Sequence, residues 1–272
     1  MSILAIARDQ ASDLIRRRYL IVILILALGI VGLFTMYLTM LRAFTEGSSR
    51  MPGSGVDQRQ FQSMMAMGLA VWQGMLHVVV SFAGTALTLM LMCCSVRSEV
   101  TKGTVRMILS RPVKRYEFVL GKWLGCVFIA LIFYTLAGGL VCFYTHRVFG
   151  QLVGVVPLSI ATSFLKAVMV GSVGMVLSMY MNPLLSGVVA YFAAGETFLF
   201  IASTFLRGTI AHLVNIPFYI LPSYKALNMY TSVMNGVRPG TADISYRVAY
   251  AILFSALMLV ITSVVFQRKD LV

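Results

Sequence analysis

Long stretches without charged residues alternate with short polar segments along this 272-residue chain. Four of the stretches contain no Asp, Glu, Lys or Arg: residues 19–41, 60–96, 123–145 and 248–267. A fifth stretch, 148–206, contains only Lys166 and Glu196. A helix needs about 20 apolar residues to cross the hydrocarbon core of a bilayer, so the first four stretches predict one span each. The fifth is long enough for two spans, divided at Asn182–Pro183, because proline lacks the amide hydrogen and breaks a helix.

The pattern therefore predicts an all-α polytopic membrane protein with a single domain over residues 1–272. Its six predicted spans cover residues 19–41, 70–95, 123–145, 160–181, 184–206 and 247–267. Before the first span, residues 2–18 predict an amphipathic helix in the membrane surface, with a plain polar lead-in to the span as the alternative. The connection 96–122 is polar and basic. The largest connection on the opposite side, 207–246, mixes prolines with apolar residues, which favours short re-entrant or interfacial helices.

The composition agrees with a membrane protein and excludes an ordinary soluble domain. Hydrophobic residues make up 59% of the chain and charged residues 11%, whereas a soluble globular chain has about 25% charged residues. With the N-terminus inside, the inner side holds four Lys and Arg before the first span, seven in 96–122 and two in the tail, against eight outside. Both termini are therefore predicted to be cytoplasmic. The net charge of +13 then follows from topology and anionic lipid headgroups, without nucleic acid.

The sequence lacks the motifs that mark common enzyme active sites. Gly121–Lys122 is not part of a phosphate-binding loop, because Tyr116 stands where that motif needs Gly and Trp123 where it needs Ser or Thr. The run from Gly171 to Gly174 fails the G-x-S-x-G pattern, because residue 170 is Val, and no H-E-x-x-H occurs. We therefore expect a chain that is not an enzyme, with no catalytic residue, no metal site and no cofactor of its own.

Sulfur-containing residues leave one alternative to that expectation. The four cysteines lie in or beside predicted spans without metal-type spacing, which favours buried apolar side chains. Several methionines gather toward the external ends of the first two predicted spans. Thioethers are soft ligands for Cu(I), so a copper route is conceivable, but methionine is also a common filler of apolar surface.

The basic connection carries the strongest positive signal. Seven of the 22 basic residues lie between residues 96 and 125: Arg97, Lys102, Arg106, Arg111, Lys114, Arg115 and Lys122. Thr104 is a suitable N-cap for a short helix through Ser110, and Pro112 ends that helix. The apolar side chains Val105, Ile108 and Leu109 form a stripe that could dock on another protein. Lys122 and Trp123 are expected to anchor the next span at the membrane interface. The alternative is an ordinary basic loop that obeys topology.

The same connection contains a longer pattern of residues. Glu99, Gly103–Thr104, Leu109–Ser110, Arg111–Pro112, Arg115, Glu117–Phe118 and Gly121–Lys122 follow the order E…GT…LSRP…R.EF..GK. This order resembles the signature of ABC-2-type transporter permeases. The tail Phe266–Leu271 is similar to the F-x-R-[RK]-D-L ending common in that family, and the amphipathic N-terminal segment agrees with it. The layout is similar over the whole chain, whereas the motif is dense over about 25 residues.

The resemblance implies a six-span permease that pairs with a second copy of itself and with two separate ABC ATPase subunits, which bind ATP and Mg²⁺. It implies a multi-pass protein of the cytoplasmic (inner) membrane of a prokaryote, in contact with membrane lipids. The short helix Thr104–Ser110 would then be the coupling helix that rests in a groove on the ATPase. The residues expected at this contact are Glu99, Gly103, Thr104, Val105, Arg106, Ile108, Leu109, Arg111 and Pro112.

Three functions are open at this point. The first is export of a substrate driven by the partner ATPase. The second, similar to the permease for nitrous-oxide reductase maturation, passes ATP-driven movement to an external protein through 207–246 without cargo. The third is a membrane scaffold or intramembrane enzyme unrelated to ATP.

Two charges inside predicted spans form a second candidate site. Lys166 and Glu196 lie 16 and 13 residues from the turn at Asn182–Pro183, or about 20–24 Å above it at 1.5 Å per residue. Two antiparallel helices could therefore bring them together, and ionisable groups in a bilayer usually pair or face a cavity. The two interpretations are an ion pair that locks the fourth and fifth spans, and a polar translocation path or proton-sensitive gate.

Overall fold

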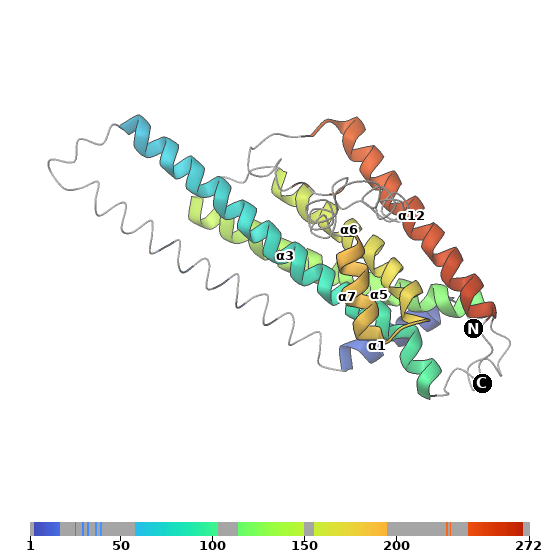
Figure 1. Cartoon of the computed structure of the whole chain (residues 1–272). Coiled ribbons are helices and arrows are strands. Elements are labelled where there is room, and N and C mark those ends of the chain that lie inside the picture. The colour runs from blue at the N-terminus through green and yellow to red at the C-terminus, as the bar shows by residue number, and fades with distance from the viewer. Residues whose placement is uncertain are drawn as a thin grey trace, which may run out of the picture.

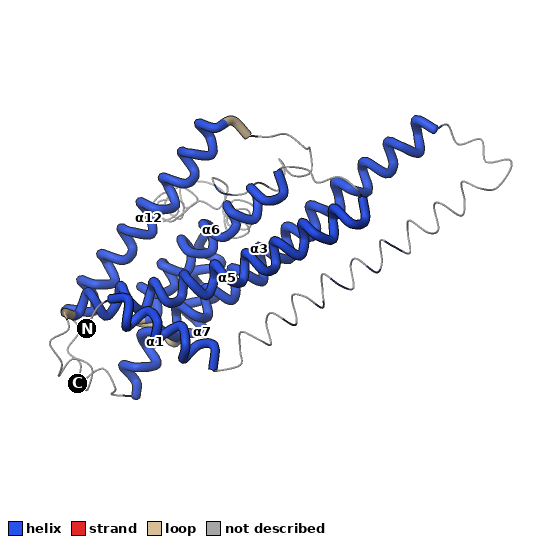
Figure 2. The backbone as a smooth tube through the Cα atoms, turned by 180° about the vertical axis from the view of Figure 1, so that it is seen from behind, coloured by secondary structure: helices blue, strands red, loops and turns tan. Residues whose placement is uncertain are grey.

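The protein is described here as a computed structural model, in which six helices account for almost all the described residues (Figure 1). Those residues are 3–16, 58–102, 114–149, 155–194 and 239–268, with single positions at 25, 29, 32, 36, 39, 227 and 229. The helices are α1 (Ile3–Arg16), α3 (Gln58–Lys102), α5 (Arg115–Phe149), α6 (Val155–Ser178), α7 (Pro183–Ala194) and α12 (Thr241–Arg268). The described part contains no strand (Figure 2), which confirms the all-α prediction there.

Four of these helices are long and apolar enough to cross a membrane. Their spanning segments are Leu76–Arg97, Arg115–Phe143, Val156–Ser178 and Thr241–Arg268, with mean hydropathy between 1.8 and 2.4. They coincide with four of the six predicted spans, at 70–95, 123–145, 160–181 and 247–267. The predicted span 19–41 lies outside the described residues apart from five single positions, and 184–206 lies outside them beyond Ala194.

The break between α6 and α7 is at the predicted place. α6 ends at Ser178, a short turn follows, and α7 begins at Pro183. The carbonyl of Asn182 accepts the amide hydrogen bond of Ser186 at 2.9 Å, which makes Asn182 the N-cap of α7. Proline is well suited to the first helical position, because its missing amide would have no partner there. The local sequence therefore sets this turn.

The helices share one end of the bundle that we call the basic end. It holds α1, the C-terminal ends of α3 and α12, the start of α5 and the turn 179–182 (Figures 1 and 2). α3 packs mainly on α6 and α5, α12 packs on α6, and α1 packs on α5. Residues that are far apart in sequence therefore lie beside each other at the basic end.

Glycines allow the central helices to approach closely. A Cβ atom at Gly171 on α6 would lie 2.5 Å from the sulfur of Met92 on α3, and one at Gly174 would lie 2.8 Å from the sulfur of Cys93. Small residues at helix interfaces let backbones come together inside membranes. The Gly171–Gly174 run therefore has a packing role between α6 and α3.

α12 is the least buried of the four membrane-length helices, and its outer face is apolar. Leu253 is 70% exposed and Val260 61% exposed, and Ile252, Leu257 and Val264 lie open on the same helix. A large exposed apolar patch is unfavourable in water and marks a surface that something else covers. This helix face is suited to contact with lipid or with another transmembrane helix.

Candidate functional site

Arg97 joins the end of the α3 span to the turn between α6 and α7. Its guanidinium nitrogen Nη1 donates hydrogen bonds to the carbonyls of Ser178 at 3.1 Å and Met181 at 2.6 Å. The last carbonyls of a helix have no partner within the helix and carry the negative end of its dipole. The arginine therefore satisfies the end of α6 and fixes α3 to it.

Arg115 makes the corresponding contact at the start of α5. Its Nη1 donates to the carbonyl of Gln267 at 3.0 Å and, more weakly, to that of Phe266 at 3.4 Å, near the end of α12. The ring of Phe266 stacks on that of Phe118, with centroids 5.8 Å apart and an angle of 21° between the planes. Two parts of the sequence pattern, Arg115…Phe118 and the tail at Phe266, are therefore in direct contact.

A capping arrangement fixes the start of α5 next to this contact. The amides of Glu117 and Phe118 donate to the carbonyl of Lys114 at 2.9 and 3.3 Å. In return, the carboxylate of Glu117 accepts a hydrogen bond from the Lys114 amide at 3.4 Å. This reciprocal pattern satisfies amides at a helix N-terminus, and a carboxylate in the first turn is favoured by the dipole. The chain direction immediately after residues 103–113 is thereby defined.

α1 lies against the first turns of α5, over two glycines. A Cβ at Gly121 would lie 2.8 Å from the Cβ of Ile6, and one at Gly125 would lie 2.9 Å from the carbonyl oxygen of Ala7. Only a residue without a side chain fits at such distances. Ile6 is 7% exposed, so the apolar side of α1 is buried on α5. The predicted N-terminal helix is therefore present, and protein covers at least part of its apolar face.

Lys122 lies beneath α1 rather than alone at the membrane interface. It is 5% exposed, its ammonium nitrogen donates to the side-chain carbonyl of Gln10, and it sits 5.6 Å from the centre of the Phe118 ring. Trp123 donates from its indole nitrogen to the hydroxyl of Ser172 at 3.0 Å, which joins α5 to α6. The expectation of a Lys122–Trp123 interfacial anchor did not anticipate these contacts, because it took no account of α1.

The predicted coupling residues lie mostly outside the described residues. The segment 103–113 contains eight of the nine: Gly103, Thr104, Val105, Arg106, Ile108, Leu109, Arg111 and Pro112. Glu99 lies in α3, but its side chain is not among those described. The structure places the two helices that flank the segment, and it shows what holds each of them.

Only one member of the predicted pair of intramembrane charges lies among the described residues. Lys166 lies on α6, half-buried, and Glu196 lies outside the described residues. His77 of α3 is a buried polar residue in the same membrane-spanning bundle, 7% exposed, and its Nδ1 has no hydrogen-bond partner among the described residues. The ion pair with Glu196 stays a prediction.

The described residues contain no group of three or more His, Cys, Asp or Glu side chains that could hold a metal ion. Most of the methionines considered as copper ligands have side chains outside the described set. The buried hydroxyls near the centre bind within their own helices, as Thr85 does to the Ser81 carbonyl at 2.6 Å. Such bonds satisfy polar groups within an apolar core.

Four membrane-length apolar helices and a largely apolar outer surface define a helical membrane protein. Residues 57–272 match the model of the family DUF2705, described as proteins of unknown function, and the chain belongs to this family. No curated protein matches the chain.

Proposed function

We propose that this protein is the permease subunit of an ABC-2-type transporter and that a separate ATPase drives it through the segment 103–113. The permease would work as a homodimer in the cytoplasmic membrane of a prokaryote, with both termini in the cytoplasm. The sequence pattern between Glu99 and Lys122 is the first support for this proposal. The lack of a phosphate-binding loop in the sequence agrees with an ATPase in another chain.

The single observation that carries the proposal furthest is the pair of arginine contacts on the two sides of the segment. Arg97 holds the α6–α7 turn and Arg115 holds the end of α12, each by charge-assisted hydrogen bonds to backbone carbonyls. Such bonds are stronger than neutral ones. A movement imposed on 103–113 would therefore reach α3 and α5 directly and α6, α7 and α12 through the two arginines.

This arrangement suits a part that transmits movement. Packed helices respond to a shift at one end as rigid elements rather than by gradual bending. The capping of α5 at Lys114 and Glu117 gives that helix a defined start directly after the segment. A loop that only satisfied the charge bias of topology would not need hydrogen bonds from its two flanking helices to α6, α7 and α12.

A site-specific cross-link tests the proposed contact. A photoactivatable side chain replaces Ile108 within the predicted apolar stripe, and a matched variant carries it at Tyr246, which is 67% exposed at the opposite end of α12. After irradiation in native membranes, we expect the first variant to be joined to a protein that contains a G-x-x-x-x-G-K-[ST] loop. The control variant, with the photoactivatable side chain at residue 246, should not be joined to such a protein. Cross-links from residue 108 to lipid alone, in membranes that hold the ATPase, would contradict the proposal.

A further inference from the structure

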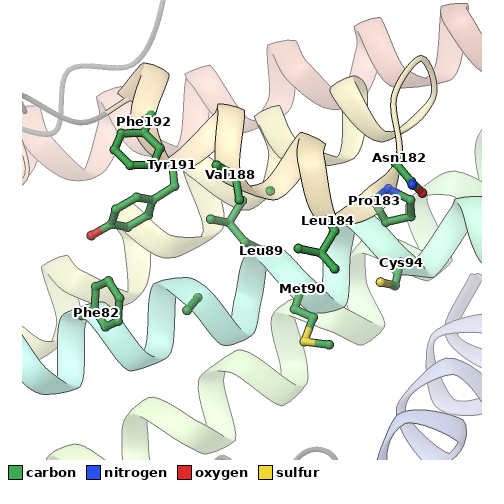
Figure 3. Close-up of a pocket in the computed structure, with 12 residues that line it drawn as sticks. Phe82, Leu89, Met90, Cys94, Asn182, Pro183, Leu184, Val188, Tyr191 and Phe192 are labelled. Atoms are coloured by element: carbon green, nitrogen blue, oxygen red, sulfur yellow. The ribbon is translucent and has the colours of Figure 1, made fainter. Parts of the chain in front are cut away.

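An apolar groove of about 620 Å³ runs between α3 and α7 on the outside of the bundle (Figure 3). Its wall on α3 includes Met90 and its wall on α7 includes Leu184 and Val188, all of which are at least 45% exposed. Leu89, which is 4% exposed, lies at the bottom of the groove. The groove therefore opens away from the helix core, toward the medium that surrounds the membrane-spanning part of the protein.

Both ends of the groove are defined. At the end farther from the basic end, the rings of Phe82 and Tyr191 meet edge to face, with centroids 5.8 Å apart. At the basic end the groove stops at Cys94 and Asn182. The twelve residue-to-residue steps from Phe82 to Cys94 correspond to about 18 Å of helix at 1.5 Å per residue. One leaflet of a bilayer provides about 15 Å of hydrocarbon, half of the roughly 30 Å core.

The length and lining of the groove suit a lipid chain. About 18 Å of helix is close to the hydrocarbon depth of one leaflet, so one extended acyl chain from that leaflet can lie along the groove from end to end. The lining is almost entirely apolar, which offers close carbon–carbon contacts to a hydrocarbon chain.

Charge at the basic end indicates which lipid the groove accepts. Asn182 is exposed at this end of the groove, and the guanidinium of Arg97 is bound to the carbonyl of the preceding residue, Met181. Basic side chains at a membrane surface attract anionic lipid headgroups. We propose that the α3–α7 groove binds one acyl chain of an anionic phospholipid from the leaflet at the basic end, with its headgroup beside Asn182 and Arg97.

Gly187 lines the groove and offers a position from which a larger side chain can fill it. A Cβ at Gly187 would meet only the sulfur of Cys93, at 3.9 Å, which is an ordinary contact. Gly187→Leu therefore extends its side chain into the groove. Gly139 on α5 is the matched control, because it is an exposed helical glycine with no atom within 4 Å of a Cβ there. Gly139→Leu adds the same side chain to a surface away from the groove.

The test uses the whole purified chain in vesicles of phosphatidylcholine with a minority of phosphatidylglycerol that carries a photoreactive acyl chain. After irradiation, mass spectrometry of peptides locates the adducts. We expect adducts concentrated on 82–94 and 183–192, reduced several-fold by Gly187→Leu and unchanged by Gly139→Leu. A photoreactive phosphatidylcholine should label the groove less, and Arg97→Gln should reduce the difference between the two lipids.

Two results would overturn the inference. The first is equal labelling of the groove and of the α12 face around Leu253, insensitive to Gly187→Leu, because that pattern describes bulk lipid contact. The second is a change in oligomeric state with Gly187→Leu and no change in labelling, because a second copy would then be the occupant. Neither result bears on the ATPase proposal, since the groove and the segment 103–113 are tested by different variants.

Discussion

Arg115, the first residue of α5, donates a hydrogen bond from its guanidinium to the backbone carbonyl of Gln267, 152 residues away and one residue before the end of α12, at 3.0 Å. Arg97 makes the equivalent contact with the Met181 carbonyl at 2.6 Å, on the other side of the segment 103–113. Residues that place positive charge on one side of the membrane thus also hold helix ends together. Arg97 and Arg115 therefore contribute both to the charge bias that orients a membrane protein and to the packing of its helices.

Replacement of Arg115 should destabilise the bundle. Arg115→Gln removes a charged donor from the carbonyls of Gln267 and Phe266, which should cost about 1–2 kcal/mol. Arg115→Lys should cost less, because the charge stays while the planar donor group is lost. Thermal unfolding of the purified chain in detergent measures both. Lys114→Gln is the control, because the exposed Lys114 side chain contacts only the Tyr116 ring among the described residues, at 5.8 Å, and the substitution keeps the backbone hydrogen bonds. An equal loss in that variant would refute the assigned contact.

The packing of α1 on α5 should depend on Gly121 and Gly125, which lie at the contact. Gly125→Val places atoms where the Ala7 carbonyl and the Gln10 side chain now lie, a type of overpacking that costs about 1–3 kcal/mol. Ala11 is 8% exposed, so a cysteine at this position reports whether α1 leaves α5. The reporter variant Ala11→Cys is made in a chain whose native cysteines are replaced. We expect its reaction with a water-soluble maleimide to accelerate, by roughly tenfold for each 1.4 kcal/mol.

The matched control for this experiment is Gly139→Val, which adds the same side chain to an open face of α5. Its maleimide reaction at residue 11 should keep the original rate. If Gly125→Val also leaves the rate unchanged, α1 does not rest on α5 as described.

The packing of α3 on α5 depends on one close contact. A Cβ at Gly84 would overlap the ring of Tyr134, whose hydroxyl donates to the Ser81 carbonyl at 3.4 Å. Gly84→Ala should therefore destabilise the bundle by about 1–3 kcal/mol. Tyr134→Leu vacates that space, so the double variant should lose less than the two single losses together, by about 0.5–3 kcal/mol. Unfolding midpoints of the four chains give this coupling, and strict additivity would show that the two residues do not meet.

Local features of the fold could be predicted from the sequence. The length of the uncharged stretches sets the helices that cross the membrane, because the bilayer thickness allows few alternatives. Pro183 sets the break between α6 and α7, because its ring excludes a continuous helix. Both rules need only the neighbouring residues, and the described helices follow them.

The contacts of the basic residues could not be predicted in the same way. Arg97 and Arg115 bind carbonyls 81 to 152 residues distant, and any basic side chain on that side of the membrane satisfies the topology rule equally. The burial of Lys122 depends on α1, which approaches through Gly121 and Gly125. Their G-x-x-x-G spacing is a sequence signal for close helix contact, although it does not say which helix makes the contact.

The predicted ion pair between Lys166 and Glu196 is open to a direct test. If it locks the fourth and fifth spans, Glu196→Gln and Lys166→Met should each cost about 3–5 kcal/mol, because one charge is left buried without its partner. The double variant should recover most of the loss. Yield and unfolding midpoint in detergent are the measurements. Unaltered stability in both single variants would instead favour a polar path.

We propose that a separate ATPase acts on this protein through residues 103–113. The most direct measurement is the ATP hydrolysis of the material purified by a tag on this chain from membranes of the cells that naturally make it. We predict hydrolysis with the unaltered chain and with Gly139→Leu, and loss of both the bound ATPase and the hydrolysis when residues 104–110 are deleted. Hydrolysis that is the same with and without 104–110, or that is absent from a complex with the unaltered chain, would contradict the claim.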